Sequence, residues 1–472
     1  MSSIVAVSAY DYSTVPTGLG DVSVARYAGG TSGAVIETKT GVVTQYTDGG
    51  TIVRLPGDTK VFHFRRDSTD YVLVAATKWV GQSPTCKYLI FTGTVPATIP
   101  SGYNWGTPVY GPTTWSLGGT SLANLYKIQA ATISGTFYLY GIDYDAATAF
   151  RLAASGSTYN LDTTNYFTFS KPTTAQEGHG VDLQLDGSNV YMLYISGTNL
   201  MLVSSASYLN STVVKTNLTF GSPVYKGPHG TTTSPASGEL WPAENAFSIQ
   251  PYGTNLLLVA VGGPQHYDIN TWNPNSHIQK IALSDLTVTN LLRAATTAEG
   301  SSYPNDCYDF RALTFSSDGS QAYLLTGKYG SGYVMSWRLY STDVATILGA
   351  GNVLVSSLVA SEAITYITKA DNLTGYLWAL LYSENTKTTW FSQGNQLAIF
   401  NAGGQVGSAM TIGSLTTLSS NAYLNGITIY NPEAAPAGMP LKGYVAPAFA
   451  SNTAAALIER KRLLDQVAAA KE

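Results

Sequence analysis

A unit of two short strands joined by a tight turn recurs along most of the chain, and this repeat limits the fold more than any other feature. Apolar strands are expected to begin at positions that lie 66, 53, 66, 66 and 54 residues apart: Tyr71, Phe137, Val190, Leu256, Ala322 and Tyr376. The turns before three of them contain glycines one 66-residue step apart, at Gly187, Gly253 and Gly319. Because a tight hairpin turn needs positive φ, which glycine adopts readily, each unit predicts a β-hairpin.

The strands before these turns alternate between apolar and polar residues, as half-buried strands do, and a third strand follows each pair. About four antiparallel strands at a mean spacing of 61 residues predict an all-β fold, a β-propeller of six to seven four-stranded blades. A β-sandwich would lack a fixed period. No helix is expected before residue 453.

The sequence divides into four parts. Residues 1–60 hold further strands, which form either a blade that closes the ring with residues 421–431 or a small appended β unit. The propeller proper is expected over 61–430, followed by a linker rich in Pro, Ala and Gly over 431–452 and a C-terminal helix over 453–472. The apolar stripe of this helix predicts a contact with another subunit through three residues: Leu457, Leu464 and Val467.

Two segments carry a family resemblance. FSSDGSQAYLL, from residue 315, and LQLDGSNVYML, from residue 183, resemble the first two strands of YVTN- and WD40-type propeller blades. The resemblance covers about 60–440 at the level of architecture and implies the fold. The Trp-Asp dipeptide of WD40 blades and the repeated box of sialidases are both missing, so the resemblance implies no particular activity.

The chain has few charged residues, and this limits the classes of partner that it is expected to bind. Only 11% of its residues are charged, against roughly 25% in an average protein, and Gly, Tyr, Thr and Ser carry its polarity instead. The net charge of −4, with no Lys/Arg cluster in the β part, excludes nucleic-acid binding through a basic patch. Neither a signal peptide nor an apolar run long enough for membrane insertion is expected. This surface is typical of virion and extracellular proteins.

Acidic residues stand in the loops that lead into several of the expected first strands. If the blades are equivalent, these carboxylates ring one mouth of the propeller: Asp58, Glu177, Glu244, Asp309 and Glu362. Two interpretations stay open. The carboxylates cap their own turns through backbone N–H groups, or their crowding recruits a cation such as Ca²⁺. No other cofactor is expected.

Aromatic and histidine residues gather in loops of the same expected face: Trp79, His179, Trp241, His266, Tyr267 and Trp272. Flat rings beside carboxylates and amides suit glycan binding, and the alternative is that the rings pack these loops onto the blade ends. His179 with Asp182 and His266 with Asp268 have no credible nucleophile beside them. No catalytic residue is therefore assigned.

The leading hypothesis is a non-enzymatic structural or adhesion module of a large extracellular assembly, best represented by the tail, nozzle or fibre of a phage virion. Its partners would be other subunits, reached through the C-terminal helix, and a glycan on the loop face. One alternative is a glycoside hydrolase or lyase that uses the carboxylate ring. Another is a bacterial surface or scaffold propeller with a protein partner.

Overall fold

The structure is a computed structural model of the 472-residue chain. It describes residues 3–11, 18–27, 36–80, 83–143, 146–168, 181–186, 189–196, 199–205, 213–218, 247–252, 256–261, 277–282, 284–285, 287–294, 309–316, 319–329, 335–355, 360–364, 379–383, 388–393, 396–401, 404–405, 410–411, 414–418 and 422–430.

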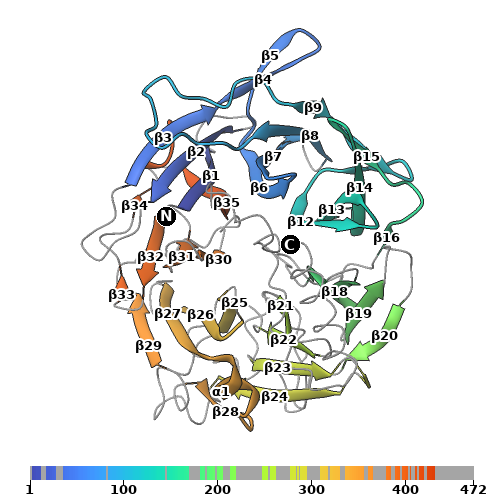
Figure 1. The fold of residues 1–472 in the computed structure, drawn as a ribbon, viewed down its shortest axis with the longest axis vertical. Helices are drawn as coiled ribbons and strands as arrows, with labels where there is room; N and C mark the ends of the chain where they lie inside the picture. The colour runs from blue at the N-terminus through green and yellow to red at the C-terminus, as the bar shows by residue number, and fades with distance from the viewer. Residues whose placement is uncertain are drawn as a thin grey trace, which may run out of the picture.

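The described strands form seven sheets of four or five strands each, arranged radially around a central axis (Figure 1). The first strand of each sheet contacts the first strand of both neighbouring sheets, so these inner strands form a closed ring. Their order around the ring is β35 (Tyr423–Tyr430), β6 (Asp58–Arg66), β12 (Leu125–Ile133), β17 (Val181–Asp186), β21 (Phe247–Tyr252), β25 (Asp309–Phe315) and β30 (Ala379–Ser383). The predicted β-propeller is confirmed.

Three further strands complete each sheet outward from the axis. The second strands are β1 (Ser3–Asp11), β7 (Thr69–Val80), β13 (Thr136–Asp143), β18 (Asn189–Ser196), β22 (Leu256–Val261), β26 (Gln321–Tyr329) and β31 (Thr388–Gln393). The third strands are β2 (Leu19–Tyr27), β8 (Ser83–Thr92), β14 (Thr148–Ser155), β19 (Asn199–Ser205), β23 (His277–Ala282), β27 (Met335–Asp343) and β32 (Gln396–Asn401). The outer strands are β3 (Ile36–Val43), β9 (Tyr110–Thr113), β15 (Thr158–Leu161), β20 (Val213–Leu218), β24 (Val288–Arg293), β29 (Ala360–Ile364) and β33 (Gly404–Gln405).

The ring is closed by one sheet to which both ends of the described chain contribute. β35 pairs antiparallel with β1, from Ile4 opposite Tyr430 to Tyr10 opposite Tyr423. β2 and β3 then continue the sheet outward. The N-terminal strands are therefore part of the propeller, and they join residues more than 400 positions apart in the sequence.

Strand alternation explains how each sheet packs against two neighbours. In β7, Val72 and Val74 lie in the core shared with the closing sheet. Leu73 and Ala75 lie in the core shared with the sheet of β12–β15. All four side chains are buried, because successive residues of a strand point to opposite faces and both faces of a blade are covered. This explains why the second strands read as continuous apolar runs.

The long connection between β8 and β9, residues 93–109, returns across the closing sheet. The backbone N–H of Trp105 donates to the carbonyl of Val42 at 3.2 Å, and that of Ile99 donates to Oε2 of Glu37 at 3.1 Å. Trp105 is only 8% exposed and lies in the same core cluster as the closing sheet. The connection therefore fastens the outer strand β3 to the neighbouring blade.

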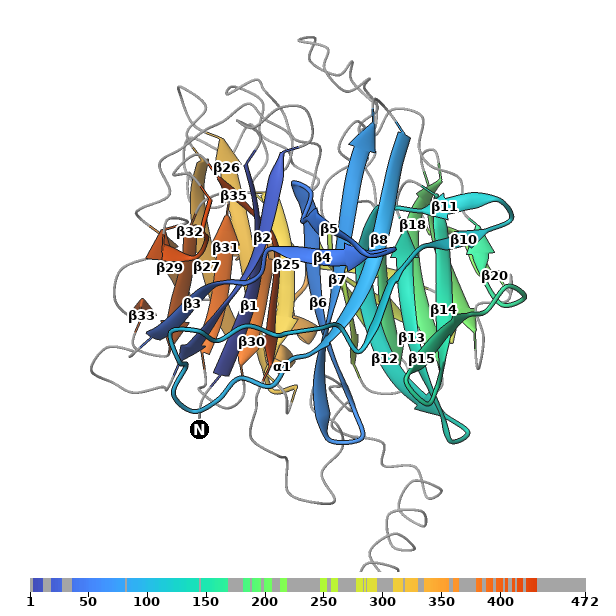
Figure 2. The ribbon, with the colours of Figure 1, turned by 90° about the horizontal axis from the view of Figure 1, so that it is seen from above.

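Several short elements add to the blades or lie outside them. β16 (Phe167–Thr168), β28 (Val353–Leu354) and β34 (Met410–Thr411) add to three of the sheets. Two separate hairpins, β4 (Gln45–Asp48) with β5 (Thr51–Arg54) and β10 (Trp115–Leu117) with β11 (Thr120–Leu122), lie outside the blades (Figure 2). In the part of the chain that the structure describes, no helix has the length and apolar character needed to cross a membrane.

A short helix, α1 (Val344–Leu348), corrects the expectation that no helix precedes residue 453. Val344 and Ile347 are buried, in the core shared by the sheets that contain β24 and β26. Five residues are too few to show a helical period in the sequence, so packing rather than pattern determines this helix. The linker and C-terminal helix expected over 431–472 lie outside the described residues.

Five of the six expected second strands are confirmed, and the sixth is wrong by one strand. Residue 376 lies outside the described residues, but the strand predicted there continues into β30, which is an inner strand. The segment expected as its inner partner begins at Ile364, where the outer strand β29 ends. β31, the true second strand, has the sequence TTWFSQ with only two apolar residues and therefore did not resemble the apolar runs of the other second strands.

Candidate functional site

β6 begins at the face of the ring that lies at the top of Figure 2, which we call the upper face. Asp58 is the first residue of β6 at this face. Leu55, Pro56 and Gly57 before it are buried, and Thr59 Oγ1 donates to the carbonyl of Pro56 at 2.7 Å. The chain therefore enters β6 through a short buried turn, and this turn holds the Asp58 carboxylate at the edge of the ring.

Asp58 links three strands. Its Oδ2 accepts a 2.8 Å hydrogen bond from Nε1 of Trp79, near the end of β7. Its Oδ1 accepts a 2.8 Å bond from Nδ2 of Asn425 in β35, which also donates to the carbonyl of Thr59 at 3.0 Å. Asp58, Trp79 and Asn425 are all half-buried. Hydrogen bonds to a charged carboxylate are among the stronger ones in proteins, so this contact joins the closing sheet to the next blade firmly.

Lys60 extends the same polar surface toward the next blade. Its Nζ donates to Oδ1 of Asn124, immediately before β12, at 2.6 Å. The backbone N–H of Asn124 donates in turn to Oδ2 of Asp143 at 2.7 Å. Asp58, Lys60, Trp79, Asn124 and Asn425 together form what we call the upper-face cluster, which spans three adjacent blades.

The sequence placed Trp79 in a long loop between the second and third strands. It lies instead in β7, and β8 begins at Ser83, so most of the expected loop is a continuation of the hairpin. The cross-strand pairs Lys78 with Thr85 and Trp79 with Pro84 extend the ladder to the tip. Figure 2 shows the far ends of β7 and β8 reaching up at this face. The ladder therefore holds Trp79 beside Asp58.

The other predicted site residues are placed as follows. Asp309 begins β25, as Asp58 begins β6, so both stand at the start of an inner strand. Glu362 lies within the outer strand β29, opposite Leu339, and not in a loop leading into an inner strand. Outside the described residues lie Glu177, His179, Trp241, Glu244, His266, Tyr267 and Trp272, together with Leu457, Leu464 and Val467.

Three members of the upper-face cluster were missed at the sequence level: Lys60, Asn124 and Asn425. Lys60 had a signal, because it stands two residues after Asp58 on a strand and therefore on the same face. Asn124 had a weaker one, as a polar residue directly before an inner strand. Asn425 had none, since 367 positions separate it from Asp58.

Elsewhere the described carboxylates also serve as acceptors within the fold. Asp21, fully buried in β2, accepts bonds from Thr416 Oγ1 and from Oγ1 of Thr417, both at 2.8 Å. Burial raises the pKa of Asp21, and the two threonines offset part of that rise. This contact fastens the closing sheet to the segment that leads into β35.

Asp162 holds the loop after β15. Its Oδ2 accepts bonds from Nη2 and Nε of Arg151, at 2.6 and 2.8 Å. Its Oδ1 accepts from the backbone N–H groups of Thr164 and Asn165, each at 3.0 Å. Burial alone would raise the pKa of Asp162, but the bonds from Arg151, Asn165 and Thr164 hold it well below its usual range.

Half-buried His63 pairs with buried Asp70 toward the opposite end of β6. Nε2 of His63 lies 3.0 Å from Oδ1 of Asp70, and the imidazole stacks on the ring of Tyr430 with centroids 4.4 Å apart. Burial lowers the pKa of His63, against the opposing effect of Asp70. Among the described residues, no three His, Cys, Asp or Glu side chains are grouped so that they could hold a metal ion.

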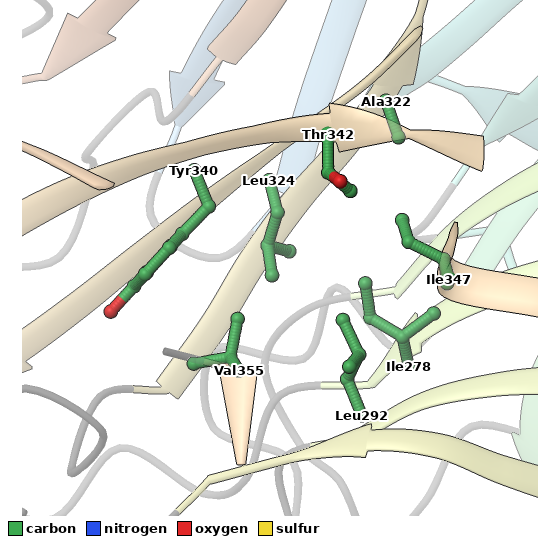
Figure 3. A pocket seen from close by; sticks show the side chains of 8 residues that line it. All are labelled: Ile278, Leu292, Ala322, Leu324, Tyr340, Thr342, Ile347 and Val355. Atoms are coloured by element: carbon green, nitrogen blue, oxygen red, sulfur yellow. The ribbon is translucent and has the colours of Figure 1, made fainter. Parts of the chain in front are cut away.

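A small apolar gap lies between two blades, beside α1 (Figure 3). Its lining comes from the facing sheets and α1: Ile278, Leu292, Ala322, Leu324, Tyr340, Thr342, Ile347 and Val355. Ile278, Leu292, Leu324 and Ile347 are buried core residues. The gap is a packing feature of the interface between blades, since its lining offers few polar groups to orient a ligand.

The sheet topology defines the class of the protein, a β-propeller with a polar cluster at one mouth. No protein-family model matches the sequence, and no curated protein matches it. Among solved structures, a provisionally assigned 6-phosphogluconolactonase from Bacteroides uniformis ATCC 8492 is 9% identical, with 91% of this chain and 99% of that one covered and a TM-score of 0.42.

Two other solved structures illustrate the breadth of the likeness. The WD40 domain of Toxoplasma gondii coronin is 9% identical, covers 74% of this chain and 68% of its own, and has a TM-score of 0.36. Xylan β-1,4-xylosidase from Bacillus halodurans C-125 is 11% identical, covers 86% and 90%, and has a TM-score of 0.28.

Proposed function

We propose that this protein is a non-enzymatic structural and adhesion subunit of a large extracellular assembly, of the kind found in the tail, nozzle or fibre of a phage virion. It would hold its neighbours through the C-terminal segment and a glycan through the upper face. The low charge of the chain, with Gly and Tyr abundant, supports an extracellular surface solvated by hydroxyls.

The observation that carries this proposal is the use of Asp58. Glycosidases need two carboxylates about 5–9.5 Å apart, each available to the substrate. Asp58 is the member of the predicted acid set whose side-chain contacts are described, and both of its oxygens accept bonds from within the fold. A carboxylate whose two oxygens are both bound within the fold stabilises the propeller and orients the side chains around it. This use suits a protein that binds a ligand better than one that cleaves it.

Asp21 and Asp162 support the same conclusion. Asp21 joins β2 to the segment before β35, and Asp162 joins the loop after β15 to Arg151 of β14. The 93–109 connection adds a further fastening across the closing sheet. A propeller whose strands and loops are joined by hydrogen bonds at so many points suits a subunit that must keep its shape within a particle.

The assembly role is tested by the mass of the intact chain in solution and of the double variant Leu457→Asp with Leu464→Asp. A stripe of a few Leu and Val side chains contributes very roughly 5–8 kcal/mol of gross burial. We therefore expect mass photometry to show that the natural chain associates and that the double variant is monomeric with an unchanged melting curve.

The matched control is Ala455→Asp with Gln466→Asp, which adds the same two charges on the opposite face of the predicted helix. This control should associate normally. A monomeric natural chain would contradict the assembly role. Unfolding of the propeller in the Leu457→Asp, Leu464→Asp variant would mean that the segment belongs to the domain's own core.

A further inference from the structure

We propose that the upper-face cluster is the glycan site and that it selects an uncharged oligosaccharide. This inference rests on the proposed adhesion function and names its ligand class and its residues.

The polar groups of the cluster come from three adjacent blades. Asp58 and Lys60 are two positions apart on β6, so their side chains leave the same face of the strand. Asn425 contacts Asp58 from the closing sheet, and Asn124 contacts Lys60 from the following sheet. Inner strands hold Asp58, Lys60 and Asn425, and Asn124 stands immediately before the inner strand β12. A rigid framework is what a specific binding site needs.

Several donors and acceptors of the cluster remain free of described partners. Lys60 carries three ammonium protons and donates one of them, to Asn124. The Nδ2 group of Asn124 and the Oδ1 atom of Asn425 make no hydrogen bond with any residue that the structure describes. The cluster therefore offers donors on Lys60 and Asn124 and an acceptor on Asn425. Sugar hydroxyls, which both donate and accept, match such a mixture.

The charges of the cluster cancel. Asp58 contributes one negative charge and Lys60 one positive charge on the same strand face. An anionic sugar would gain from Lys60 and lose to Asp58, and a cation would meet the reverse. An uncharged ligand avoids both penalties while it still receives the hydrogen bonds, so the cluster favours neutral over acidic glycans.

Trp79 adds the apolar surface that a pyranose ring requires. Its indole N–H is bound to Asp58, which determines the plane of the ring. The side chain is half-buried, so part of the indole is exposed beside Asp58 near the tip of the β7–β8 hairpin. C–H faces of sugars stack on such rings.

The test is binding of the full chain to an immobilised panel of oligosaccharides, with maltohexaose, cellohexaose and chitohexaose as neutral members and oligogalacturonate and sialyllactose as acidic ones. We expect at least one neutral oligosaccharide to bind at least 10-fold more tightly than its acidic counterparts. Trp79→Ala and Lys60→Met should each weaken that binding at least 10-fold. Ile52→Ser, on the exposed β4–β5 hairpin, should leave it unchanged.

Trp79→Phe separates binding from folding, because it keeps an aromatic face and removes the bond to Asp58. It should lower the melting temperature and retain more binding than Trp79→Ala. Binding that prefers acidic oligosaccharides, or that Trp79→Ala and Lys60→Met leave intact, would overturn the inference, as would a panel with no neutral ligand. In each of those cases, normal association of the chain would show that the assembly role survives.

Discussion

The indole nitrogen of Trp79 lies 2.8 Å from Oδ2 of Asp58, so the end of one strand orients a carboxylate at the beginning of the strand beside it. Both residues belong to the hairpin of β6 and β7, and Asn425 of β35 completes the contact. The same carboxylate therefore anchors the ring closure and shapes the upper face.

Asp58→Asn tests this anchoring. An amide offers one oxygen and brings two protons toward donors, so at least one of the two bonds is lost. We expect the free energy of unfolding to fall by about 1.5–3 kcal/mol, as for hydrogen bonds to charged groups. Asp67→Asn is the control, because that side chain is 86% exposed. Equal effects of the two substitutions on urea unfolding would contradict the structural role of Asp58.

Gly426→Ala tests how closely β35 approaches β6. A Cβ at this position would stand 2.7 Å from the backbone nitrogen of Val61 and 2.6 Å from Oγ of Ser8. Since the backbone of Val61 cannot move without disturbing the ring, we expect a loss of about 1–3 kcal/mol, as for overpacked cores. Gly102→Ala, where nothing lies within 4 Å of the added Cβ, should be neutral. Equal melting temperatures of the two variants would contradict the ring closure.

Asp162 predicts an acid-dependent loss of stability. Its pKa in the folded state is lowered, while in the unfolded state it titrates near 3.9. The ionised group therefore stabilises the fold above about pH 4, and that contribution disappears as the pH falls through the lowered folded-state pKa. The melting temperatures of the natural protein and of Asp162→Asn should differ most near neutral pH and converge in acid. A difference that is constant with pH would contradict this assignment.

The thiol of Cys86 should be inert in the folded protein. Burial raises its pKa to about 12, against roughly 8.5 for a free cysteine, and the side chain is 1% exposed. In a Cys307→Ser background, we expect a disulfide reagent at pH 8 to label Cys86 only after denaturation. Stoichiometric labelling of the folded chain would show that the interface between these blades opens readily.

The propeller was predictable because its signal is local and repeated. Each hairpin carries its own turn chemistry, as at Gly319, whose φ of +70° is the conformation that the predicted turn requires. The sixth repeat failed because the apolar run that begins at Tyr376 leads into the inner strand β30 and not into a second strand. The local pattern of one strand does not reveal its rank within a sheet, which depends on pairing with strands far away in the sequence.

The candidate site was predictable only in part, for the same reason. Asp58 and Trp79 were chosen for their residue types and expected positions, yet their mutual bond depends on the extension of β7 and β8 beyond the expected loop. Asn425 reaches the cluster only because the two ends of the chain close the ring. Contacts made by ring closure leave no periodic mark in the sequence.

The central claim is that this propeller binds a glycan without cleaving it. Analysis of the oligosaccharide after incubation with the protein tests this claim most directly. The neutral oligosaccharide selected by the binding panel would be incubated with the natural protein, Glu177→Gln and Glu244→Gln, and followed by mass spectrometry. We expect intact oligosaccharide after prolonged incubation with all three proteins, and similar affinities. Hydrolysis by the natural protein that either substitution abolishes would contradict the claim and identify a glycosidase.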